Sequence, residues 1–242
     1  MNFIVQEIPV PWDFIMELYR AEEYWKWRNN PFNIYHEVPN NINPRELCPV
    51  GSVEFVCSWY KEIFSKYPHP KNIPLEMTCL DDYEHRDIRY CKLPEEEDII
   101  ELLPFYLKSA TRIKADFNGL YDFADNRLNS IYDTVYVSPV VEGIISEWRC
   151  FIYNSEILDI KCYSGDPWLI PSKPDILRHL NNFIKVCHDK VPPSFTIDVG
   201  VTKFREVELI EIHDFFSCGL YGFSDYSKYP YMLWRWFKWF TK

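Results

Sequence analysis

The residues with the most chemical potential lie in two pairs of short segments in the second half of the chain. SEWRCFI and ILDIKCY contain Arg149 and Lys161, and FTIDVGV and VELIEIH contain Asp198, Glu211 and His213. In all four segments apolar and polar residues alternate with period two, which is typical of β-strands with one apolar face. The pattern predicts two β-hairpins that each carry charged side chains on one face.

The first hairpin brings two cations together. A three-residue turn at 154–156 places Arg149 opposite Lys161, with Glu147 and Asp159 nearby on the same face. The opposite face is predicted to be apolar and to consist of Trp148, Cys150, Ile152, Leu158, Ile160 and Cys162.

The second hairpin brings two carboxylates together. A turn around 203–206 places Asp198 opposite Glu211, with His213 on the same face. Like charges directly opposite each other destabilise a sheet, by about 3 kcal/mol for charges about 5 Å apart at an effective dielectric of about 20. A ligand of opposite charge would remove that cost.

Together the hairpins describe a site for a metal–nucleotide complex. Facing cations suit a polyphosphate, and facing carboxylates beside an imidazole suit a hard divalent cation. In the alternative without a ligand, Arg149 pairs diagonally with Glu147 or Asp159, while Asp198 and Glu211 are solvated.

Other well-known site motifs are missing from the sequence. With seven glycines, the chain has neither GxxxxGK[ST] nor GxGxxG, so any nucleotide must be bound by side chains. It also lacks GxSxG, HExxH and a Cys/His cluster at zinc spacing, which removes the usual support for a serine hydrolase or a zinc enzyme.

The elements that must position these residues follow from hydrophobic periodicity and from breakers. A change in glycine content, with an acidic run at 94–98, predicts an N-terminal region at 1–102 and a second domain at 103–242. Residues 31–49 are predicted to form a Pro/Asn-rich loop. An aromatic tail at 229–242 predicts a terminal helix that docks on the core, with membrane-surface affinity as the alternative. The other predicted elements are helices over 12–27, 52–67 and 173–190, and strands over 3–8, 105–109, 134–141, 145–153, 157–163, 195–201 and 207–213.

Composition limits the partners and the compartment. A net charge of −10 argues against general nucleic-acid binding, which needs a surplus of Lys and Arg. Eight cysteines without a CxxC pair are interpreted as free thiols in a reducing cytosol, so a cytoplasmic location is expected. No apolar run is long enough to predict a membrane span.

The motifs EWRCFI, ILDIKCYSGD, IDVGV and ELIEIHD…GLYGF, in this order and spacing, resemble the ATP-grasp superfamily. The resemblance is to the clade named for an arginine and two lysines, which includes the eukaryotic factor that assembles translation initiation factor two. It covers about 104–223. It implies an α+β ATP-grasp fold of antiparallel, hairpin-rich lobes with flanking helices, preceded by a variable N-terminal α/β region.

The resemblance also implies roles for basic residues and for a hinge. Arg149 and Lys161 would contact the phosphates of ATP, and the second lysine would be Lys108, with Lys114 as the competitor. The stretch that includes Val140, Val141 and Glu142 is similar to the hinge whose backbone holds the adenine edge. These three residues complete the predicted nucleotide-binding set.

For the metal, the resemblance implies that Asp198 and Glu211 hold Mg²⁺ between the β- and γ-phosphates. His213 stands where ATP-grasp enzymes often have Asn. Imidazole suits Mg²⁺ less well than a carbonyl oxygen, so His213 would favour Mn²⁺, bind only one of two ions, or leave the role to Asp214. The alternative for His213 is a strand-end histidine bonded to a carboxylate.

The chemistry implied is an ADP-producing carboxylate–amine ligation through an acyl phosphate, in which Arg149 and Lys161 are the catalytic residues. The expected partners are ATP, a carboxylate substrate and an amine acceptor, with a peptide or protein as a candidate for either. The alternative is an ATP-binding assembly chaperone that forms no ligation product and uses aromatic surfaces around Trp25, Trp27 and the C-terminal tail.

Overall fold

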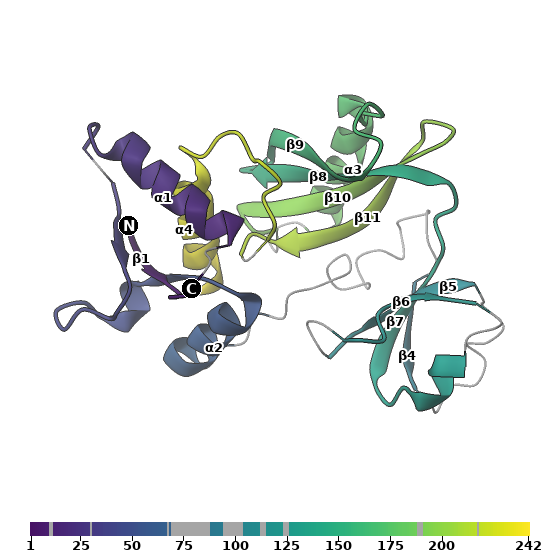
Figure 1. The fold of residues 1–242 in the computed structure, drawn as a ribbon, viewed down its shortest axis with the longest axis horizontal. Coiled ribbons are helices and arrows are strands. Elements are labelled where there is room, and N and C mark those ends of the chain that lie inside the picture. The colour runs from purple at the N-terminus through teal and green to yellow at the C-terminus, as the bar shows by residue number, and fades with distance from the viewer. Residues whose placement is uncertain are drawn as a thin grey trace.

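The computed structural model describes residues 1–9, 12–29, 31–66, 68, 88–93, 104–111, 115–122, 126–187, 191–216 and 218–242. Within them, three sheets and four α-helices are arranged as Figure 1 shows. In chain order the elements are β1 (Asn2–Val5), α1 (Asp13–Trp25), β2 (Asn33–Tyr35), η1 (Pro44–Glu46), β3 (Cys48–Val50), α2 (Val53–Phe64), β4 (Arg89–Lys92), β5 (Phe105–Ser109), β6 (Gly119–Tyr121), η4 (Asn126–Ser130), β7 (Thr134–Pro139), β8 (Ile144–Tyr153), β9 (Glu156–Gly165), α3 (Lys173–Cys187), β10 (Ser194–Thr202), β11 (Val207–Asp214) and α4 (Tyr229–Phe240).

The N-terminal unit is a small parallel sheet, in the order β2-β1-β3, covered by helices. Helix α1 buries the stripe Phe14, Ile15, Leu18 and Ala21 at helical spacing, because these residues recur on one face. The loop predicted at 31–49 is partly wrong, since it contains β2 and β3. Each of these strands has only three residues, too few to show a period in the sequence.

The C-terminal helix α4 packs into this N-terminal core, beside α1 in Figure 1. Trp236 and Phe237 are buried there, and Trp236 donates its ring N–H to Asp214 at 2.9 Å. The predicted docking of a terminal helix is therefore confirmed. Its aromatic density stabilises the core of the molecule.

The second sheet is antiparallel, in the order β11-β10-β8-β9. One face packs on α3, and the other contributes Phe151 to the N-terminal core. Strand β10 lies between β11 and β8, and every one of its residues is buried.

The third sheet, in the order β4-β7-β5-β6, has a hydrophobic core of its own. The domain boundary predicted near residue 102 stays a prediction, and contacts cross it in both directions. Strand β4 precedes the boundary and pairs with β7, whereas α4 follows it and packs in the N-terminal core.

Two expectations about the environment can be compared with the described residues. The seven cysteines among them carry free thiols, as predicted, and six are buried. In the same part of the chain, no helix has the length and apolar character needed to cross a membrane. The compartment stays a prediction.

Candidate active site

A row of four charged side chains crosses one face of the second sheet. The register pairs Glu211 with Asp198, Asp198 with Arg149, and Arg149 with Lys161. Side chains directly opposite each other lie on the same face, so the row has the charges minus, minus, plus, plus. The predicted pairs, Arg149 with Lys161 and Asp198 with Glu211, are confirmed, whereas each hairpin also contains a register shift that was not predicted.

The like-charge repulsion expected within each hairpin is offset, because the hairpins join through β8 and β10. Arg149 donates from Nε to Oδ1 of Asp198 at 2.9 Å and from Nη2 to Oδ2 at 2.8 Å. This bidentate pair is buried, with side-chain exposures of 9% and 1%. The repulsion expected between the two cations, and between the two carboxylates, is therefore compensated, since the central neighbours carry opposite charges.

The three-residue turn predicted for the first hairpin is also wrong, although the pair Arg149 with Lys161 is right. Tyr153 pairs with Glu156, so the turn has two residues, Asn154 and Ser155, both in the left-handed conformation at φ 48° and 65°. Leu158 is then an extra residue, a β-bulge that restores the register. It packs on the N-terminal core, away from the apolar face where it was expected.

The third sheet supplies Lys108, which lies on β5. Its Nζ donates to Oε2 of Glu211, so the charged row continues from one sheet to the other. His213 lies at the far side of the same carboxylate, with Nε2 2.9 Å from Oε1 of Glu211 and 3.6 Å from Oδ2 of Asp198. Glu211 thus lies between two basic groups.

These contacts shift the pKa values of Glu211 and His213. Burial alone would raise the pKa of Glu211, but the charges and hydrogen bonds of His213 and Lys108 lower it to about 2. Burial alone would lower the pKa of His213, but Glu211 and Asp198 raise it to about 9. The Glu211 carboxylate is therefore held ionised beside a protonated imidazole.

A metal ion fits this donor set. Asp198, Glu211 and His213 each offer one ligand atom, and these three atoms lie within 4.8 Å of one another. Two carboxylate oxygens and a neutral imidazole nitrogen are suitable donors for a divalent cation, so metal binding through His213 would require loss of its proton. The two carboxylates are paired with basic side chains, Asp198 with Arg149 and Glu211 with Lys108.

A cavity of about 360 Å³ adjoins the row, between the two sheets. Its lining includes both Lys108 and Glu211 and the predicted hinge residues Val140 and Val141. Glu142 is not among the described lining residues. Lys114 lies outside the described part of the chain. The described lining is Ile88, Tyr106, Lys108, Ser138, Pro139, Val140, Val141, Ile144, Glu147, Tyr163, Ile210 and Glu211.

The segment 218–224, named here the clamp segment, connects to both cations of the row. Arg149 donates from Nη1 to the carbonyl oxygen of Gly219 at 3.0 Å. At the other end, Ser224 donates from its backbone N–H and its hydroxyl to Oδ2 of Asp159, at 2.8 and 2.6 Å. The same oxygen lies 3.2 Å from Nζ of Lys161.

Two tyrosines flank the guanidinium of Arg149, and the sequence pattern did not predict either of them. The rings of Tyr163 and Tyr221 stack at 5.3 Å, and the guanidinium carbon of Arg149 lies 5.7 and 5.2 Å from their centres. Tyr163 also donates its hydroxyl hydrogen to Glu147 at 2.9 Å. The motif GLYGF carried Tyr221, but nothing in its spacing indicates that the ring folds back over Arg149.

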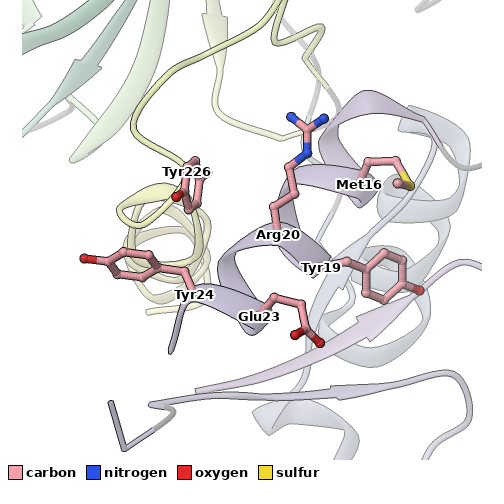
Figure 2. Close-up of a pocket in the computed structure, with 6 residues that line it drawn as sticks. All are labelled: Met16, Tyr19, Arg20, Glu23, Tyr24 and Tyr226. Carbon is pink, nitrogen blue, oxygen red and sulfur yellow. The ribbon is translucent and has the colours of Figure 1, made fainter. Parts of the chain in front are cut away.

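A larger cavity of about 610 Å³ contains none of the residues predicted for the site. It is a groove on the outer face of α1, shown in Figure 2. Two of its rings, those of Tyr24 and Tyr226, meet edge to face at 5.6 Å. The lining is Met16, Tyr19, Arg20, Glu23, Tyr24 and Tyr226.

Solved structures share the architecture that positions this site. D-alanine–D-alanine ligase from Bacillus anthracis, complexed with ATP, matches with a TM-score of 0.56 and 13% identity, over 98% of this chain and 97% of that one. The ATP-grasp ligase PsnB, complexed with a minimal precursor, Mg and ADP, matches at 0.53 and 10%, over 98% of each chain. N5-carboxyaminoimidazole synthetase from Staphylococcus aureus matches at 0.57 and 10%, over 97% and 77%.

These likenesses define the fold as ATP-grasp, so the predicted fold class is confirmed. Residues 83–229, more than half of the chain, match the ATP-grasp domain of family 2 in the clade named for an arginine and two lysines, and the chain belongs to this family. The resemblance to that clade is thereby confirmed. Proteins of curated function yield no sequence match.

Proposed function

We propose that this protein is an ADP-producing ligase that joins a carboxylate to an amine and uses ATP held between the β4–β7 and β8–β11 sheets. The observation that carries the proposal is the four-charge row, which continues through Lys108 into the cavity lined by Val140 and Val141. Basic and acidic groups in the lining of a partly apolar cavity suit a nucleotide polyphosphate with its metal.

In this proposal the basic residues bind and orient phosphate. Lys108 and Lys161 approach from different sheets, and Arg149 is fixed between its partners, so charge is positioned before ATP arrives. Bound Mg²⁺, or Mn²⁺ as an alternative, would neutralise charge on the β- and γ-phosphates. Asp198, Glu211 and His213 would hold the ion, and binding would release Lys108 from Glu211 to the phosphates.

The reaction proposed has two steps. An oxygen of the substrate carboxylate attacks the γ-phosphorus, the bond to the β-phosphate oxygen breaks, and ADP leaves. The amine nitrogen then attacks the acyl phosphate carbon, phosphate leaves, and the amine gives up a proton. Lys108, Arg149 and Lys161 would stabilise the negative charge that moves between these oxygens.

For the substrate, we propose a peptide or protein as the carrier of the carboxylate or the amine. The groove on α1 gives room for such a chain outside the nucleotide cavity (Figure 2). PsnB, which shares the fold, is complexed with a minimal precursor. The assembly-chaperone alternative loses two of its three expected surfaces, because Trp25 donates its ring N–H to the Ser227 carbonyl and α4 is packed in the core.

The metal site is tested by Glu211→Gln, which keeps the shape of the side chain and removes its charge. We expect Mg²⁺-dependent ADP production to fall at least about a hundredfold, since a metal ligand and its charge are lost. Circular dichroism should be unchanged. Glu208→Gln, on the same strand, is the matched control and should retain full activity. Normal turnover in Glu211→Gln would refute the metal assignment.

The ligation step has its own experiment. The chain is incubated with candidate peptides or proteins and Mg-ATP, and an ATP-dependent mass change is sought by mass spectrometry, with Lys161→Ala as the inactive control. A product that forms with release of ADP supports the ligase. A stable complex that forms with bound ATP and releases no ADP would favour the assembly chaperone.

A further inference from the structure

The clamp segment connects to both cations of the charged row, directly to Arg149 and through Asp159 to Lys161. Its Gly219 carbonyl accepts from Arg149, and its Ser224 is bonded to the Asp159 carboxylate that pairs with Lys161. A shift of this segment would therefore move the two cations that are proposed to bind phosphate.

The clamp segment has an unfavourable local conformation. Tyr221 adopts φ +46°, a left-handed conformation that non-glycine residues rarely populate. Its ring lies so close to the preceding backbone that a Cβ at Gly219 would lie 3.0 Å from the ring carbon Cζ. Such a conformation persists only when surrounding contacts hold it.

One of these contacts comes from the N-terminal unit. The backbone N–H of Leu220 donates to Oδ2 of Asp13 at 2.6 Å, across 207 residues of sequence. The other oxygen of Asp13 accepts from the N–H of Phe14 at 2.8 Å, at the start of α1, where Trp12 provides no side-chain cap. A carboxylate is favoured at a helix N-terminus, so this acceptor is held in place.

We propose that Asp13 is a positioning residue of the nucleotide site. It fixes the Leu220 peptide, which aims the Gly219 carbonyl at Arg149 and keeps Ser224 on Asp159. The inference rests on the proposed function and deepens it. Asp13 lies outside residues 83–229, which match the family, so the N-terminal unit completes a site that the matched region does not close alone.

The test combines two measurements on the full-length chain with Asp13→Ala. Hydrogen exchange of the peptide that covers Leu220 to Ser224 reports directly on the bond to Asp13. Calorimetry with the non-hydrolysable analogue AMP-PNP and Mg²⁺ gives the nucleotide Kd. We expect exchange about tenfold faster and a Kd about tenfold weaker, the effect of losing one hydrogen bond to a charged acceptor.

Two further variants separate positioning from general destabilisation. Asp13→Asn retains one acceptor oxygen and should recover most of the affinity. Asp175→Ala removes a carboxylate from the first turn of another helix, α3, where its partners among the described residues are Ser172 and Arg178, both outside the clamp segment. It should lose stability and leave both measurements unchanged.

Each result has one meaning. Faster exchange with weaker binding supports the proposal, whereas a change in only one of the two, or in neither, overturns it. A wild-type chain that does not bind AMP-PNP overturns the proposed function and the nucleotide part of this inference. In that case the exchange at Leu220 still decides whether Asp13 holds the clamp segment.

Discussion

At the scale of single residues, the central contact is the buried pair of Arg149 and Asp198. Both groups belong to the charged row, and each satisfies the other through two hydrogen bonds. Burial of ions is costly, so such a pair is tolerated because both partners are present, and it fixes geometry more than it adds stability. In this molecule it holds a guanidinium and a carboxylate in place before any ligand binds.

Removal of one partner is therefore expected to be more harmful than removal of both. Arg149→Met leaves Asp198 buried without its main counter-ion and should lower the free energy of unfolding by about 3–5 kcal/mol. The double variant Arg149→Met/Asp198→Leu should recover more than half of that loss. Urea denaturation of the wild type and of all variants of this cycle, including Asp198→Leu, measures the coupling. Strictly additive losses would contradict it.

At the scale of elements, the strands of the second sheet depend on irregular positions. The two-residue turn and the bulge at Leu158 together put Arg149 opposite Lys161, and a second irregularity adjoins Trp148 and Glu147. Strand β9 ends at Gly165, which adopts φ +77° and whose position for a Cβ lies 1.9 Å from the carbonyl oxygen of Ile145. Glycine is therefore required there on two counts.

Gly222 gives a matched comparison, because its φ is +80° and no described atom lies within 4 Å of a Cβ placed there. Gly222→Ala should lower the free energy of unfolding by about 1 kcal/mol, from backbone conformation alone. Gly165→Ala should cost at least about 3 kcal/mol, because the strand ends must also separate. Thermal and urea unfolding measure both variants. Equal losses would show that the contact with Ile145 relaxes freely.

At the scale of the whole molecule, the candidate site joins parts that are distant in the chain. The β4–β7 sheet contributes Lys108, and the β8–β11 sheet contributes the charged row. The N-terminal unit contributes Asp13. The proposed ligand would lie between the two antiparallel sheets and contact both. Its binding energy would then stabilise their relative placement as well as each sheet by itself.

Mg-ATP is accordingly expected to raise the melting temperature. At a concentration about a hundredfold above Kd, the gain is about 2.7 kcal/mol, or roughly 5–10 °C for a chain of this size. Lys108→Met should abolish most of that shift because it removes the contact from the β4–β7 sheet. Lys185→Met, which alters an exposed lysine of α3, is the control and should retain it. A full shift in Lys108→Met would count against ATP contacting both sheets.

The two hairpins, their central charged pairs and the chemical character of one face could be predicted from the sequence. Period-two alternation decides which side chains share a face, so the partners Arg149 with Lys161 and Asp198 with Glu211 were predictable. The terminal helix was predictable too, because its aromatic residues need a core. Strands of three residues, such as β2 and β3, carry too little pattern to predict.

How the two hairpins meet could be learned only from the folded molecule. Because β8 pairs with β10, Arg149 lies beside Asp198 and forms an ion pair with it. Each hairpin alone was expected to hold only a pair of like charges. Contacts across a long stretch of chain, such as Lys108 with Glu211 or Asp13 with Leu220, leave no local period in the sequence. The physical reason is that alternation encodes which face a residue occupies, whereas the choice between neighbouring strands depends on packing summed over the whole fold.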